Sequence, residues 1–129
     1  MSRIITTHHV DELNKLFEIK ATRYPDNSEY ENLYSVLAWA DSVTPTTPRL
    51  VGSTIVFQSQ PFTGLQSLNG VTTESVLAVL IDRLEQFQAG PFPCYENRLA
   101  IMHLESALDL LKDRSDDRRE RGVEGTHAR

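Results

Sequence analysis

The sequence predicts an α+β protein: a small antiparallel β-sheet plus a C-terminal antiparallel two-helix hairpin, with an N-terminal helical segment. Apolar residues recur at helical spacing in the first and last thirds of the chain and alternate at strand spacing between them, and a glycine-proline corner divides the last third. With 129 residues and 40% hydrophobic composition, the chain is predicted to form a single domain with a modest core. Its parts are residues 1–43, 51–70 and 71–126.

The N-terminal segment is predicted to contain two helices. Val10 to Ala21 carries apolar residues on one side and ends before Tyr24-Pro25, because a residue that precedes proline is disfavoured in helical geometry. Ser28 and Glu31 form a capping-box pattern, and tyrosines and leucines follow on one helical face. Aromatic side chains can stack on a base, but at helical spacing we interpret these as core residues.

The middle of the chain predicts a linker and then strands. Residues 44–48, with two prolines and three threonines, disfavour both helix and ladder hydrogen bonds. Val51 to Phe57 alternates and is rich in β-branched residues, which predicts a strand central to the sheet. Leu65 to Leu68 is a shorter candidate strand, and Asn69-Gly70 predicts a turn into the hairpin.

The hairpin has clear start and stop signals. Thr72 or Thr73 caps the first helix, whose apolar residues recur at three-and-four spacing. Gly90-Pro91 ends that helix, and the second helix restarts near Pro93, which is tolerated in a first helical turn. The leucine seam of the second helix continues into a charged stretch with three arginines at i, i+4, i+7: Arg114, Arg118 and Arg121.

Two interpretations of this arginine line stay open. Acidic residues are interleaved with the arginines, which is typical of a solvated helix end. Alternatively, the guanidinium groups face a phosphate-bearing ligand or a partner subunit from one side of the helix.

Composition excludes several functions. A net charge of −5 disfavours a binder of polymeric nucleic acid or of an anionic membrane, and no apolar run approaches membrane-spanning length. The lone Cys94 and the polar N-terminus fit a reducing cytoplasm. Adjacent His8-His9 has no completing ligands, so we expect no metal site. No catalytic motif occurs, and we therefore expect no catalytic residues, no cofactor and no enzyme activity.

Several local motifs, all between about Val51 and Thr126, carry a resemblance to a known family. They are Ile55-Val56-Phe57-Gln58, Asn69-Gly70-Val71-Thr72, Asp82-Arg83-Leu84, Phe87-Gln88-Ala89-Gly90-Pro91-Phe92 with Cys94 and Glu96-Asn97, and Arg121-Gly122-Val123-Glu124-Gly125-Thr126. In these motifs the chain resembles the phage-encoded Thoeris anti-defence sponges of the first described type, whose helical hairpin is shared with the anti-CBASS cyclic-nucleotide sponges. The segment before Pro45 carries no diagnostic motif.

The resemblance implies a function, ligands and an assembly. It implies a phage protein that acts in the cytoplasm of the infected bacterial host, where it binds cyclic ADP-ribose isomers and sequesters them without degradation. Cyclic di- or trinucleotides are further ligands in some members, and members assemble as homodimers or hexamers. The positions that match the pocket for cyclic ADP-ribose are Phe87, Asn97, Arg114 and Arg118.

A second nucleotide site is expected at the tail, built from Arg118, Arg121, Gly125 and Thr126 of neighbouring subunits. Two glycines allow a turn that aims amide groups at an anion, and a frayed terminus is the alternative. The main pocket also requires two copies, because Asn97 and Arg114 are separated by about 25 Å of helix rise.

Two other functions remain open. The arginine line could meet acidic residues of a protein partner, which would make the chain a protein–protein interaction module with no small ligand. A phosphodiesterase that degrades the signal is less favoured, because the chain has no recognisable metal site or general base.

Overall fold

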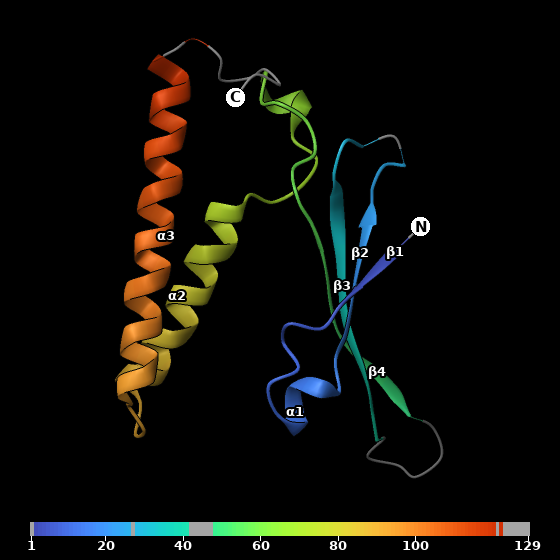
Figure 1. Cartoon of the computed structure of the whole chain (residues 1–129), viewed down its shortest axis with the longest axis vertical. Coiled ribbons are helices and arrows are strands. Elements are labelled where there is room, and N and C mark those ends of the chain that lie inside the picture. The colour runs from blue at the N-terminus through green and yellow to red at the C-terminus, as the bar shows by residue number, and fades with distance from the viewer. Residues whose placement is uncertain (1, 27, 42–47, 121, 123–129) are drawn as a thin grey trace. The chain divides into compact units, whose positions relative to one another are not determined.

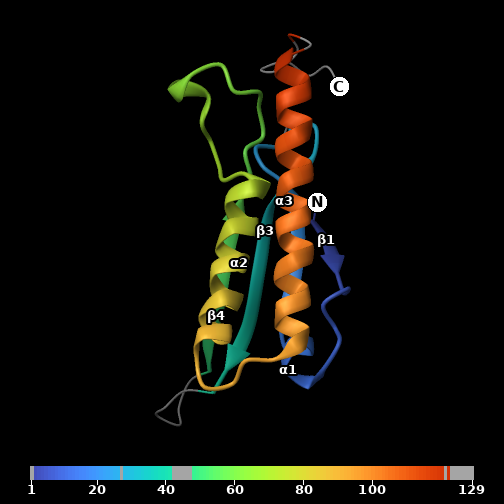
Figure 2. The same cartoon turned by 90° about the vertical axis from the view of Figure 1, so that its left-hand side faces the viewer.

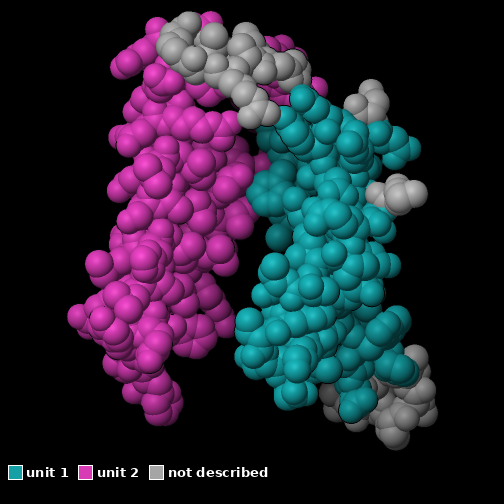
Figure 3. Space-filling view, in the orientation of Figure 1, with its two compact units in different colours: residues 1–59 teal, residues 60–129 magenta. Residues whose placement is uncertain are grey.

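The computed structural model describes residues 2–26, 28–41, 48–120 and 122 (Figure 1). The chain divides into two compact units, residues 1–59 and 60–129, which Figure 3 shows in separate colours. The first unit contains β1 (Ser2–Ile5), α1 (Glu12–Lys15), β2 (Glu18–Arg23), β3 (Glu31–Ala40) and β4 (Arg49–Val56). The second contains the short 3-10 helix η1 (Leu65–Ser67) and the helices α2 (Thr73–Ala89) and α3 (Tyr95–Glu120). The α+β prediction is confirmed.

The first unit is a four-stranded antiparallel sheet in the order β1-β2-β3-β4. Its register places Ala21 opposite Tyr34, and Tyr34 opposite Ile55. Because side chains alternate between faces along a strand, these three residues share one face. Phe57, just after β4, packs edge to face on Tyr34 with ring centroids 5.6 Å apart.

The predicted N-terminal helical segment is wrong. Only α1, four residues long, is an α-helix in the described part of residues 1–43, and most of the two predicted helices is β2 and β3. The apolar residues of β3 lie at i, i+1, i+3 and i+4, a spacing that fits a helical face and also fits a strand with apolar residues on both sides. The segment forms a strand because it pairs with β2 on one side and β4 on the other. The spacing of apolar residues within the segment carries no information about this pairing.

The expected capping box at Ser28 and Glu31 is likewise replaced by a β2–β3 turn. Ser28 and Asn32 are both buried, and the Ser28 hydroxyl donates to Asn32 Oδ1 at 3.0 Å. The Asn32 side-chain amide donates to the Tyr24 carbonyl, and Arg23 Nη1 donates to the Ser28 carbonyl at 3.0 Å. The buried side chains of Ser28 and Asn32 are therefore hydrogen-bonded, as buried polar groups generally are.

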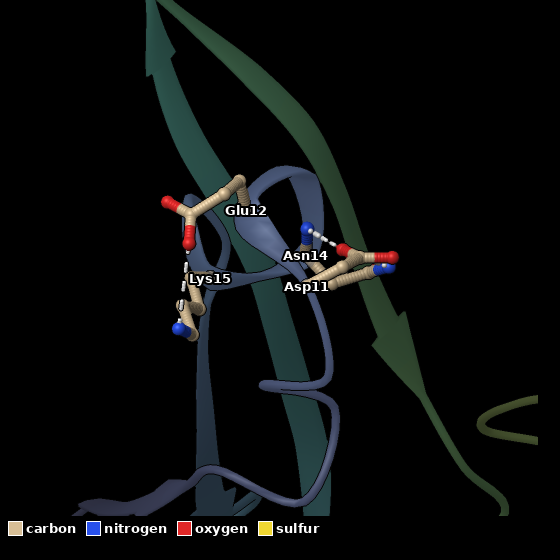
Figure 4. Close-up of polar contacts among 4 residues, drawn as sticks. All are labelled: Asp11, Glu12, Asn14 and Lys15. Atoms are coloured by element: carbon tan, nitrogen blue, oxygen red, sulfur yellow. Dashed lines mark hydrogen bonds and ion pairs between the residues drawn. The ribbon is translucent and has the colours of Figure 1, made fainter.

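The helix α1 is a single turn with a side-chain cap. Asp11 Oδ1 accepts from the Asn14 backbone amide at 2.7 Å, and Glu12 and Lys15 form an ion pair at 3.5 Å (Figure 4). The connection between β1 and β2 is also tied by His8, whose Nε2 lies 2.6 Å from the Phe17 carbonyl oxygen. The side-chain cap satisfies an amide at the start of α1, which has no buried residue of its own.

Two further expectations about the middle of the chain need correction. A strand does form over Val51–Val56, but β4 lies at an edge of the sheet and is not central. Leu65–Ser67 is a 3-10 turn and not a strand, with the Ser67 hydroxyl donating to the Gly64 carbonyl at 2.7 Å. The predicted linker lies outside the described residues except for Pro48.

The predicted hairpin is confirmed, and its helices lie side by side in both views (Figures 1 and 2). Thr72 caps α2 through a capping box: its Oγ1 accepts from the Ser75 amide at 3.0 Å, and Ser75 Oγ accepts from the Thr72 amide at 3.1 Å. The helix α2 ends at Gly90, and α3 restarts at Tyr95.

Each unit has a thin core. Among the described residues, the buried hydrophobic side chains are Ala21, Ala38 and Ile81. Large apolar side chains remain exposed in both units, including Trp39 at 70% and Phe92 at 84%. No helix in the described part of the chain is long and apolar enough to cross a membrane. Exposed apolar area on this scale is typical of interaction surfaces.

Candidate anion-binding site

The corner of the hairpin is closed by Gln88. Its side-chain nitrogen donates to the Cys94 carbonyl at 2.9 Å, and its side-chain oxygen accepts from the Cys94 amide at 2.9 Å. These two bonds join the last turn of α2 to the residue before α3. They therefore fix where α3 starts relative to α2, and thereby which residues face each other at the far end of the hairpin.

At that far end, the first turn of α2 and the C-terminal half of α3 enclose a pocket of about 210 Å³. It is lined by Thr73, Glu74, Leu111, Arg114, Ser115 and Arg118. Two of the four predicted ligand-binding residues, Arg114 and Arg118, thus lie together in one pocket. They are four positions apart on α3, which places them one turn apart on the same face.

The electrostatics of this pocket favour an anion. Arg114 is exposed and forms no ion pair with any described residue, while Arg118 is half-buried. The first amides of α2, those of Thr73 and Glu74, have no acceptor among the described residues, and the helix dipole adds positive potential there. The side chains that line the pocket carry two guanidinium groups and one carboxylate, that of Glu74, so the lining has more positive than negative charge.

The other two predicted ligand-binding residues lie at the opposite end of the hairpin. Phe87 is in the last turn of α2, is 49% exposed, and carries the Arg83 guanidinium 4.7 Å above its ring. Asn97, half-buried, is in the first turn of α3. One chain therefore does not bring Phe87 and Asn97 to the arginine pocket, in agreement with the rise of about 25 Å along α3.

The tail proposed for a second nucleotide site is outside the described residues, with Gly122 the exception. Arg121, Gly125 and Thr126 therefore have no structural description, and Arg118 is the one member of that set that the structure places. No group of three or more His, Cys, Asp or Glu side chains suited to a metal ion occurs over the described ranges.

The sequence prediction missed the wall of the pocket that α2 contributes. In the sequence, Thr73 is predicted only as a possible helix cap, and no motif marks Glu74 as part of a pocket. Counting outward from the Gly90-Pro91 corner along both helices would have paired the start of α2 with α3 near Leu111, because the two antiparallel helices have the same rise per residue.

The fold defines a class: α+β proteins with a C-terminal antiparallel helical hairpin, which in this chain carries an arginine-lined pocket. Residues 51–111 match the Acb2/Tad1 hairpin domain. The chain is also 47% identical over 75 residues to Thoeris anti-defense 1 of Bacillus phage SBSphiJ7. Over this hairpin the chain is therefore similar to phage Thoeris anti-defence proteins, which confirms the resemblance seen in its sequence motifs.

The extent of the similarity is limited. It covers 58% of this chain and 52% of the relative, so the matched part spans about half the length of the protein it resembles. Phe87 and Asn97 lie inside the matched domain, and Arg114 and Arg118 follow its last residue. The strands β1 to β3 precede it entirely.

Proposed function

We propose that this protein acts in phage anti-defence by binding a cyclic ADP-ribose signal and sequestering it without chemical change. The observation that carries the proposal is the pair Arg114 and Arg118 in a pocket at the start of α2. Two guanidinium groups and two amide donors suit a pyrophosphate, which offers several acceptor oxygens and negative charge.

The size of the pocket supports a site shared between copies. Ligand sites commonly enclose about 300–1,000 Å³. The 210 Å³ beside the arginines in one chain is below that range, although it has room for a phosphate group. In the proposed complex, the arginines of one copy hold the phosphates, while Phe87 and Asn97 of another copy stack on the adenine and bond its polar edge.

Sequestration fits these residues better than degradation. The groups that line the pocket are two arginines, one carboxylate, two hydroxyls and a leucine, a set that binds phosphate but pairs no nucleophile with a base. The protein is therefore proposed to lower the free concentration of the signal. To compete with a host receptor tuned to the same molecule, it needs nanomolar affinity, or about −12 kcal/mol.

The test is recovery of the ligand. The purified protein is titrated with cyclic ADP-ribose isomers by calorimetry, and the saturated complex is then heat-denatured and its nucleotide identified by mass spectrometry. We expect nanomolar binding and intact nucleotide. Recovery of a hydrolysis product would make the protein an enzyme, and absence of binding to every isomer would favour the alternative, a protein–protein interaction module, for which the exposed apolar side chains are the supporting observation.

A further inference from the structure

The two edges of the β-sheet differ in how well they are protected. The edge strand β1 is four residues long and carries Arg3, which pairs with Glu31 at 2.9 Å. The edge strand β4 has eight residues, RLVGSTIV, with no proline, no lysine and one charge at its first position. Natural sheets usually protect a long edge with charges, prolines or bulges, because its free amides and carbonyls can pair with another strand. The β4 edge has none of these protections after Arg49.

The alternation of hydrogen bonds identifies which groups of β4 face outward. The Phe57 amide donates to the Asn32 carbonyl of β3 at 2.9 Å. In an antiparallel ladder, residues alternate between bonding one neighbour and bonding the other. Val51, Ser53 and Ile55 are therefore expected to bond β3, so the amides and carbonyls of Leu50, Gly52, Thr54 and Val56 point away from it.

We propose that β4 pairs antiparallel with β4 of a second copy of this chain, about a two-fold axis at Ser53, to form a continuous eight-stranded sheet. A two-fold axis perpendicular to the sheet keeps each face on the same side, so only registers that pair residues of one face are allowed. With Ser53 on the axis, Val51 lies opposite Ile55 of the second copy, and Leu50 lies opposite Val56. Every larger apolar side chain of β4 then has an apolar partner across the new junction.

Both neighbouring registers are less favourable, since with Thr54 on the axis Ile55 would lie opposite Ser53 and Val56 opposite Gly52. With Gly52 on the axis, Arg49 would lie opposite Ile55, Leu50 opposite Thr54, and Val56 would have no partner in the strand. The Ser53 register also groups the small residues Gly52, Ser53 and Thr54 at the centre, where the backbones approach most closely. This self-complementarity is the reason to assign the edge to a second copy of the chain; the assignment goes beyond nucleotide binding and does not depend on it.

The register predicts a specific cross-link. The backbone amide and carbonyl of Ser53 are directed to β3 and cannot bond the second copy. The two Ser53 residues therefore form a non-hydrogen-bonded pair across the axis, with Cα atoms about 4.5 Å apart. Disulfides accept Cα separations of about 4.4–6.8 Å. In a Cys94→Ser background, which removes the exposed native thiol, Ser53→Cys should give a disulfide-linked dimer after mild oxidation with oxidised glutathione.

Thr54→Cys in the same background is the matched control, because it adds an exposed thiol one residue away that would face Gly52 of the second copy. We expect most Ser53→Cys chains and few Thr54→Cys chains to run as dimers on a non-reducing denaturing gel. A monomeric Ser53→Cys protein, or equal linking of both variants, would overturn the proposal.

Adding Thr54→Pro to the Ser53→Cys chain gives a second test. This proline removes an outward amide and leaves the β3 ladder intact. The yield of linked dimer should fall at least tenfold, with an unchanged far-ultraviolet circular dichroism spectrum, whereas Thr54→Val should retain it. A folded Thr54→Pro protein that links as well as its parent would also contradict the paired edge.

Discussion

Gln88 and Cys94 form a two-bond clasp across the hairpin corner, with both the side-chain donor and acceptor of Gln88 used on the backbone of Cys94 at 2.9 Å. The thiol takes no part in it. The clasp joins the end of α2 to the start of α3, and the anion pocket lies at the other end of the same two helices.

Gln88→Ala should destabilise the protein by about 1–3 kcal/mol, because it removes two hydrogen bonds and each contributes a net of about 0.5–1.5 kcal/mol. Urea unfolding monitored by circular dichroism measures the change. Gln86→Ala is the control: Gln86 donates one exposed bond to Asp82 on the same helix, at 2.7 Å, and its loss should cost clearly less. Equal effects would show that the clasp adds nothing beyond helix propensity.

Arg114→Ala and Arg118→Ala should each weaken binding of cyclic ADP-ribose by roughly ten- to a hundredfold, since a hydrogen bond to a charged group contributes about 1.5–3 kcal/mol. Calorimetry measures the change, and light scattering should report the same assembly as the wild type. Arg119→Ala is the matched control on the same helix: Arg119 pairs with Asp116 at 3.2 Å and does not line the pocket. If the two pocket variants bind as tightly as this control, the arginines do not hold the ligand.

Mixing two weakened variants tests whether the site is shared between copies. Phe87→Ala and Arg118→Ala should each bind cyclic ADP-ribose more weakly than the wild type when alone, because every pocket then lacks one group. Co-expressed with different affinity tags and purified through both, a mixed dimer should regain wild-type affinity at about half of its sites, since one of its two pockets is built from intact halves. A mixed assembly whose sites all stay weakened would place all four ligand-binding residues in one chain, contrary to the geometry of the hairpin.

Truncation after Gly122 separates a second nucleotide site from a passive tail. The shortened chain should lose binding of cyclic trinucleotides and keep binding of cyclic ADP-ribose, because Arg114 and Arg118 are retained while Gly125 and Thr126 are removed. Calorimetry with both ligands on the same preparation provides the comparison. Unchanged binding of the trinucleotide would assign the tail no role in recognition.

The helical hairpin was predictable because its signals are local. Thr72 caps the N-terminus of α2 and Gly90-Pro91 ends the helix, and neither signal depends on contacts with distant parts of the chain. The first unit was not predictable in this way. The apolar spacing in β3 fits both a helix and a strand, and the hydrogen bonds that decide between them come from β2 and β4, whose paired residues lie 8 to 23 positions away along the chain.

The site was predictable in part for the same reason. Two arginines one turn apart on a helix share a face, so the sequence alone could place Arg114 and Arg118 together. The wall formed by Thr73 and Glu74 depends on how two helices align, which the corner determines. In the proposed complex this pocket meets Phe87 and Asn97 of another copy of the chain, and no pattern within one sequence encodes the distance between two molecules.

Gly52 has a consequence for tracing the ancestry of this sheet. Its φ of +136° is unfavourable for other residues, and a Cβ there would overlap the Val36 carbonyl oxygen of β3. Gly52 lies inside the segment shared with known relatives, whereas Val36 lies before it. A homologue that keeps this sheet is therefore expected to keep glycine at this position even where its N-terminal half has diverged beyond recognition, and a larger residue there would indicate that the neighbouring strand is absent or moved.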